Sequence, residues 1–216
     1  MRIEGCALNK RIDLSSLVRG GEKFQQQVFD AVRRTAGEYN GEALGVVHPC
    51  FYYGFREEHP EEAFENENQH MSGPVSRHLG PNDYPDFLGR LANEMATTDR
   101  PIFVFLDERN FAGWPHAKAF LDNILPKNFI IPIMTRSGNS DGYPQILFNG
   151  RPDARLVGTT LMQLGFTSIF LAGEFAWHLV NEDMGCVYGI AEQLQMFTTV
   201  NVWRQLTFPN RWYGAL

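Results

Sequence analysis

The sequence has few of the features that mark proteins that bind nucleic acids or carry disulfides. Its formal net charge is −6 at pH 7 and its pI is near 5.5, so it lacks the basic stripe that displaces counterions from phosphates. Its three cysteines are an odd number without a CxxC pair, which indicates neither a disulfide framework nor a zinc ribbon. We therefore expect no nucleic-acid partner and a reducing, cytoplasmic location.

Long apolar runs are missing as well. Charged residues interrupt the stretch 1–8 too early for the apolar core of a signal peptide, and no run approaches the ~18 apolar residues of a membrane-spanning helix. The phosphate-binding motifs GxxxxGK[ST] and GxGxxG do not occur. The sequence thus predicts no membrane partner and no cofactor.

What the chain does contain is enough apolar material for one α/β domain spanning residues 1–216. Apolar residues make up 44% and aromatic residues 13% of the 216 residues, which suffices for a sizeable core. Residues 1–42 are interpreted as an N-terminal helical extension, because Phe24, Val28 and Val32 recur at helical spacing. Residues 56–83, rich in Glu, Asn, His, Gly and Pro, are interpreted as a polar insertion or a lid.

Short apolar runs alternate with helical patterns along the rest of the chain. This alternation predicts a three-layer, Rossmann-like fold, in which a mainly parallel sheet carries helices on both faces. Pro132 removes a backbone donor from one of these runs, so we expect that strand to be an edge strand or irregular. The predicted strands are 43–47, 102–106, 129–134, 145–148, 168–172 and 198–203, and the predicted helices begin near 83, 115, 156 and 185.

Three histidines in the polar insertion raise the question of a metal site. His59, His70 and His78 are separated by eleven and eight residues, and this spacing matches no compact ligand motif. Solvated histidines on a polar loop are the simpler interpretation, so the sequence predicts no metal centre.

Polar residues follow several of the predicted strands directly. His48 follows the first strand, Asp107 and Glu108 the second, and Glu174 the one that begins at Ser168. Ligands of open α/β sheets bind beyond the carboxyl ends of parallel strands, which makes these residues site candidates. Charged residues also occur there simply because the chain reaches the surface, and Glu174 could equally cap a helix.

Two stretches downstream resemble the isochorismatase-like cysteine hydrolases. The run Ala154-Arg-Leu-Val-Gly-Thr-Thr-Leu161 is similar to the segment before the catalytic strand of that family. The run Leu164-Gly-Phe-Thr-Ser-Ile-Phe-Leu-Ala-Gly173 continues the likeness, and Cys186 stands where the family has its nucleophile. The resemblance implies a hydrolase that attacks a C–N or related bond of a small molecule with a Cys–Asp–Lys triad. The field of a helix beginning at Cys186 would favour its thiolate.

The chain departs from the pattern of that family at three places. His48 replaces the first-strand aspartate, the lysine position falls near Gly150 with only Arg151 close by, and extra residues stand around 176–184. A rewired enzyme would then use Cys186 with Asp107, Glu108 or Glu174, and His48 or Arg151 as a polar partner. The alternatives are a non-catalytic ligand-binding or protein-interaction protein in which Cys186 is a core residue, and a different α/β fold altogether.

Aromatic residues near the site and at the C-terminus suggest contacts with a ligand or a partner. Trp177 and His178 could close over a substrate or form an interface patch. The aromatic segment 208–213 could dock on a second subunit, so we expect a homo-oligomer.

Overall fold

The structure is a computed structural model, and it places most of the residues that the sequence assigns to regular elements. Residues 1–39 of the predicted helical extension and residues 56–82 of the predicted polar insertion lie outside the described residues. The described ranges are 40–51, 53, 83–108, 114–126, 130–136, 144–148, 150–174 and 185–208.

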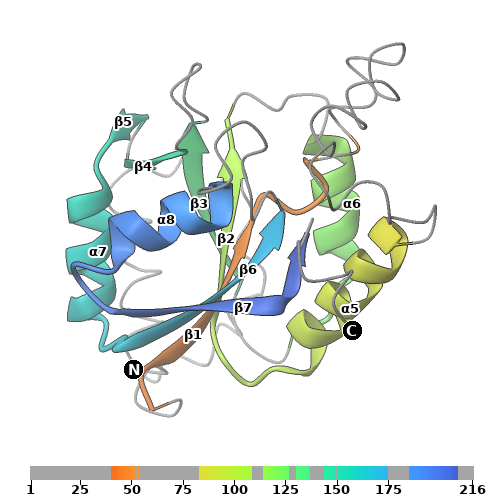
Figure 1. The fold of residues 1–216 in the computed structure, drawn as a ribbon, viewed down its shortest axis with the longest axis horizontal. Coiled ribbons are helices and arrows are strands. Elements are labelled where there is room, and N and C mark those ends of the chain that lie inside the picture. The colour runs from red at the N-terminus through yellow and green to blue at the C-terminus, as the bar shows by residue number, and fades with distance from the viewer. Residues whose placement is uncertain are drawn as a thin grey trace, which may run out of the picture.

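A seven-stranded sheet forms the centre of the fold, with the strand order β5-β4-β3-β2-β1-β6-β7 (Figure 1). Five of its strands run parallel to one another, and among them the apolar runs 43–47 and 102–106 are buried throughout, as the sequence predicts. These strands are β1 (Glu42–Val47), β2 (Ile102–Asp107), β3 (Ile130–Arg136), β6 (Ser168–Glu174) and β7 (Thr199–Phe208).

The other two strands make the sheet mixed. β4 (Gln145–Phe148) runs antiparallel to β3, and β5 (Arg151–Pro152) runs antiparallel to β4. The α/β class is therefore confirmed. The predicted parallel arrangement holds only for the five adjacent strands β3, β2, β1, β6 and β7. Only two residues separate β4 from β5 in the chain, which is possible because antiparallel neighbours need no long crossover.

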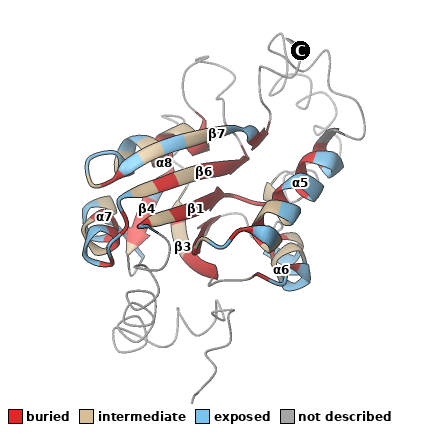
Figure 2. Cartoon of the chain, turned by 90° about the horizontal axis from the view of Figure 1, so that it is seen from below, coloured by how far each residue is buried: buried red, intermediate tan, exposed pale blue. Residues whose placement is uncertain are grey.

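Helices lie against both faces of this sheet (Figure 2). α7 (Ala154–Gln163) and α8 (Cys186–Leu194) contribute Leu161 and Ile190 to the core on one face. α5 (Asp83–Thr97) and α6 (Trp114–Asn123) contribute residues such as Phe87 to the core on the other face. The four predicted helices and the predicted strands are thus confirmed, with ends shifted by a few residues.

Alternation along the strands decides which core each side chain joins. Phe103 and Phe105 of β2 pack with α7 and α8, whereas Val104 and Leu106 pack with α5 and α6. Successive side chains of a strand point to opposite faces. The next residue of β2, Asp107, therefore falls on the α8 side.

The position of Pro132 corrects one expectation. β3 lies between β2 and β4 and is not an edge strand of the whole sheet. Its pairing with β4, however, involves only Thr135 and Arg136, whereas its pairing with β2 includes Pro132. Pro132 thus has a paired neighbour on one side only, where a residue without an N–H is tolerated.

Candidate functional site

The order of the parallel strands reverses between β1 and β6. From β1 the chain adds β2 and β3 on one side, and it then crosses back to add β6 and β7 on the other side. In open α/β sheets such a reversal leaves a place for ligands beyond the carboxyl ends of the two central strands. His48 and Glu174 stand at this place, at the ends of β1 and β6.

The turn after β1 has an uncommon backbone conformation. His48 and Cys50 have positive φ angles of 50° and 64°, in the left-handed region that non-glycine residues seldom adopt. The His48 N–H donates to the carbonyl of Phe105 at 2.8 Å, and the Phe51 N–H donates to the carbonyl of His48 at 3.2 Å. Strained residues of this kind concentrate at functional sites.

Gly173 allows β6 to approach this turn closely. Its φ is +122°, and a Cβ atom at this position would lie 2.2 Å from the carbonyl oxygen of Val47. Only glycine fits such a conformation without strain. The glycine thereby places the next residue, Glu174, within hydrogen-bond distance of the turn.

Glu174 connects the turn to helix α5. Its side chain is buried, and Oε1 accepts the backbone N–H of Cys50 at 2.6 Å and the hydroxyl of Tyr84 at 2.8 Å. Burial raises the pKa of the Cys50 thiol and of the Tyr84 hydroxyl, and the nearby Glu174 carboxylate raises both further. Glu174 therefore lies on the α5 side of the sheet and holds the turn in place.

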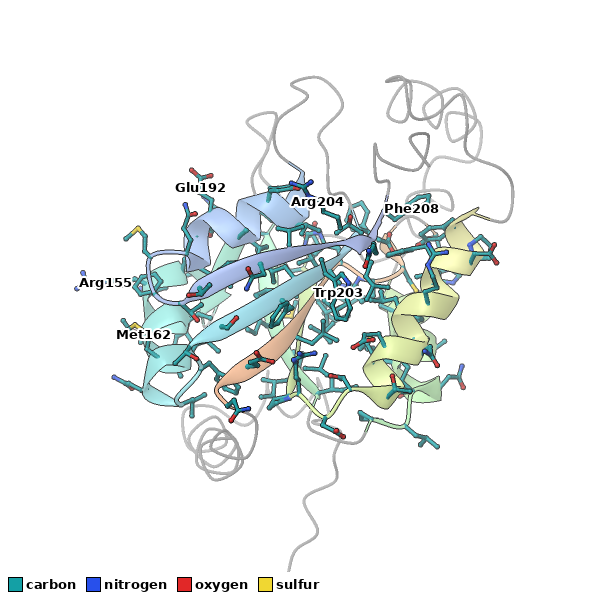
Figure 3. All side chains as sticks on the ribbon, turned by 60° about the horizontal axis from the view of Figure 1, so that its bottom comes forward. Arg155, Met162, Glu192, Trp203, Arg204 and Phe208 are labelled. Atoms are coloured by element: carbon teal, nitrogen blue, oxygen red, sulfur yellow. The ribbon has the colours of Figure 1, made fainter. Side chains whose placement is uncertain are left out.

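Aromatic rings pack around Tyr84 on that side. The ring centroid of Phe208 lies 5.0 Å from that of Tyr84 and 5.4 Å from that of Phe87, and Figure 3 shows Phe208 at the end of β7 near α5. The ring of Tyr53 meets Tyr84 edge-on at 5.1 Å. Such pairs add to the stability of buried clusters, so the α5 side of the site is a packed support.

A second polar group lies on the opposite side, facing α8. Asp107 is buried at the end of β2 and is paired in register with Thr135 of β3, so their side chains share a face. The Nε2 atom of His48 lies 2.7 Å from the Thr135 hydroxyl. His48 thus spans the end of β2, and it joins Asp107 and Thr135 on the α8 side.

Cys186 is the first residue of α8 and packs against the core on that same side. Burial raises the pKa of its thiol to about 12, and the Asp107 and Glu174 carboxylates act in the same direction, Asp107 more strongly. A backbone hydrogen bond lowers the pKa of Cys186, but by less. The helix N-terminus is expected to favour a thiolate, but burial and the neighbouring carboxylates outweigh it, and the net effect is a raised pKa.

Of the two remaining predicted residues in the described part, Glu108 lies near this centre and Arg151 does not. Trp114, which the sequence does not predict, also contacts the end of β2. Glu108 is half-buried and forms an ion pair with Arg136 at the end of β3. Trp114 donates its indole N–H to the Asp107 carbonyl at 2.9 Å. Arg151 is exposed on β5, the outermost strand of the sheet, and the structure does not bring it together with the others.

Five residues that the sequence pattern singles out belong to segments outside the described ranges. Trp177 and His178 lie outside the described residues, as do His59, His70 and His78. Within the described ranges, no group of three or more His, Cys, Asp and Glu side chains is arranged to hold a metal ion.

Sequence reasoning missed Thr135, Tyr84 and the role of Cys50. Thr135 carries the same signal as Asp107, since it is a polar residue near the end of a buried strand. Tyr84 gives no such signal, because it belongs to the apolar face of a helix. Cys50 contributes through its backbone N–H, which no sequence pattern reveals.

Comparison of the chain with protein-family models, with curated proteins and with solved structures finds no match in any of the three. Among the helices of the described residues, none has both the length and the apolar character needed to cross a membrane.

Proposed function

We propose that the chain is a divergent isochorismatase-like hydrolase that cleaves a C–N or related bond of a small molecule with Cys186 as the nucleophile. The observation that carries the proposal is the shared position of Cys186 and Asp107 at the α8 side of the strand ends, where the carboxylate acts on the thiol. The proposal includes the three-layer, Rossmann-like arrangement, a cytoplasmic location and a homo-oligomeric state.

In the proposed reaction Asp107 is the general base and acid. The raised pKa of Cys186 keeps the resting thiol protonated at neutral pH. As Sγ adds to the substrate carbonyl carbon, the thiol proton moves to the Asp107 carboxylate, which then gives it to the leaving nitrogen as the C–N bond breaks. A water molecule then attacks the resulting thioester while Asp107 accepts its proton. As the C–S bond breaks, Asp107 returns that proton to Sγ, and the carboxylic acid product leaves.

Glu174 has a different role in this proposal, although the sequence suggests it as a catalytic residue. Its carboxylate is engaged by the Cys50 N–H and the Tyr84 hydroxyl on the α5 side of the sheet. From there it holds the turn that carries His48. Glu174 is therefore a positioning residue, and Asp107 is the carboxylate that serves Cys186.

The proposal is tested by release of ammonia or amine from a panel of small carboxamides. We expect turnover by the unaltered protein, loss of turnover in Cys186→Ala and in Asp107→Asn, and retention in Cys50→Ala. Thermal unfolding of each variant separates loss of chemistry from loss of structure. Turnover that survives in a folded Cys186→Ala variant would exclude the cysteine as nucleophile.

A second candidate, a ligand-binding protein without catalysis, is favoured by the same raised pKa. A thiol that titrates near pH 12 is a poor nucleophile unless a base takes its proton. In that case small carboxamides would bind without being consumed. Cys186→Ala would then leave their affinity within about twofold of the original, which is the scale of a substitution that removes no strong interaction.

A further inference from the structure

One nitrogen of the His48 ring has no partner in the described part of the protein. The His48 side chain is only 2% exposed, and its Nε2 atom is engaged by Thr135. Its Nδ1 atom is buried and makes no hydrogen bond with any described residue. Buried polar atoms of native proteins are nearly always hydrogen-bonded, so an unpartnered one calls for an explanation.

The neighbours of the ring decide which nitrogen carries the proton. The Thr135 hydroxyl donates its single hydrogen to the carbonyl of Leu106, at 3.1 Å. It can then only accept from His48, so Nε2 must carry the ring proton in this arrangement. Nδ1 is left with a bare lone pair, which is an acceptor and needs a donor.

This acceptor belongs to the same side of the sheet as the proposed catalytic pair. His48 reaches Thr135 across the end of β2, and Thr135 is the register partner of Asp107. Asp107 in turn acts on Cys186 at the start of α8. His48 therefore lies on the same side of the strand ends as the thiol and the carboxylate.

We infer that His48 Nδ1 accepts a hydrogen bond from an amide N–H of the substrate, so that the site selects primary and secondary carboxamides over tertiary amides. This inference rests on the proposed function. In an amide, the N–H nitrogen is bonded directly to the carbonyl carbon that Sγ would attack. A site built to pair with a substrate N–H strongly rejects analogues that lack it.

The electrostatic environment supports an acceptor role. Burial lowers the pKa of His48 to about 3. The ring therefore stays neutral near pH 7, and Nδ1 keeps its lone pair available to a donor. Because so weak a base would take up a proton poorly, His48 is a specificity-determining residue here and not the base of the reaction.

Nitrogen NMR of the histidine rings tests this assignment directly. The Cys186→Ala variant is used, because it cannot turn over and so reports binding alone. The probes are acetamide and N-methylacetamide, with N,N-dimethylacetamide as the matched control that lacks an N–H. We expect His48 to show a protonated Nε2 and an unprotonated Nδ1, and we expect only the two N–H probes to shift the Nδ1 resonance.

Two substitutions at His48 then test the roles of the two ring nitrogens separately. His48→Asn places an amide oxygen near the position of Nδ1 and suits a left-handed backbone. His48→Gln keeps an amide group that reaches Thr135 but has no acceptor at the position of Nδ1. We expect His48→Gln to bind acetamide roughly 10-fold more weakly and to lose the preference over the dimethyl probe. His48→Asn should keep that preference.

The assignment would be overturned by a protonated Nδ1, by equal shifts with all three probes, or by no shift with any of them. The last result would mean that an ordered water or another group serves Nδ1. Failure of the proposed hydrolysis is a separate result, because N–H-selective binding at His48 in the absence of turnover leaves this inference standing.

Discussion

The Glu174 carboxylate accepts the backbone N–H of Cys50 at 2.6 Å and so joins the end of β6 to the turn after β1. The bond crosses the point where the strand order reverses. It lies on the α5 side of the sheet, whereas Asp107 and Cys186 lie on the α8 side. Glu174 thus supports the turn on one face of the strand ends, and the proposed catalytic pair lies on the other face.

Because Glu174 holds the turn in place, truncating its side chain should strongly lower the stability of the protein. Glu174→Ala leaves the Cys50 N–H and the Tyr84 hydroxyl without this acceptor, and each such loss costs about 1–3 kcal/mol. We expect the free energy of unfolding in urea to fall by about 2–6 kcal/mol. Glu174→Gln keeps an acceptor oxygen and should lose clearly less, and an equal loss in both variants would show that the negative charge is what matters.

Asp107→Asn should change the reactivity of Cys186 and the turnover in opposite directions. Removing this carboxylate takes away the larger of the two charges that raise the thiol pKa, so the pKa of Cys186 falls. Peptide-resolved iodoacetamide labelling should then proceed faster at Cys186, while turnover is lost with the general base. Asp86→Asn, on the exposed face of α5, is the charge-matched control. Slower labelling in Asp107→Asn would contradict the proposed contact.

Two glycine substitutions form a matched pair. Gly173→Ala introduces a Cβ atom 2.2 Å from the Val47 carbonyl oxygen at a φ of +122°, whereas a Cβ atom at Gly89 meets nothing within 4 Å. We expect Gly173→Ala to destabilise the protein by at least about 2 kcal/mol. Gly89→Ala should stabilise it by about 0.5–1 kcal/mol, because alanine is the better helix former. Similar effects of both changes on urea unfolding would contradict the close approach of β6 to β1.

Stability should also depend on pH through His48. The pKa of His48 is about 3 in the folded chain against 6.5 as its ordinary value. The unfolded state therefore binds more protons between these two values, and stability falls as the pH falls below about 6.5, by up to about 1.4 kcal/mol per pH unit from this group.

The measurement is urea unfolding from about pH 7 to about pH 4. His48→Asn should flatten the dependence by the share that His48 contributes. An unchanged slope would mean that His48 titrates alike in the folded and unfolded states.

Local patterns in the sequence predicted the strands and helices because buried parallel strands are short, wholly apolar runs between helical repeats. They also predicted Asp107 and Glu174 as site candidates, since polar residues at the ends of such runs lie at the edge of the sheet. They could not assign these residues to faces, which depends on the pairing register. They also could not foresee the β4–β5 hairpin, because antiparallel pairing there depends on contacts between strands that are themselves very short.

The pKa of Cys186 shows a further limit of local reasoning. Its place at the start of a helix is visible in the sequence and by itself favours a thiolate. The burial of the thiol comes from tertiary packing, and the Asp107 carboxylate comes from β2, some eighty residues earlier in the chain. Tertiary packing therefore reverses the local effect.

The left-handed residues after β1 have a consequence for motion. A non-glycine residue in that region costs roughly 1–2 kcal/mol, and His48 and Cys50 both adopt it. Breaking the bond from the Cys50 N–H to Glu174 would let the turn relax, so this part of the chain should open with less free energy than the buried centre of the sheet. Hydrogen exchange at the Cys50 amide would then record the opening of the site as an event separate from global unfolding.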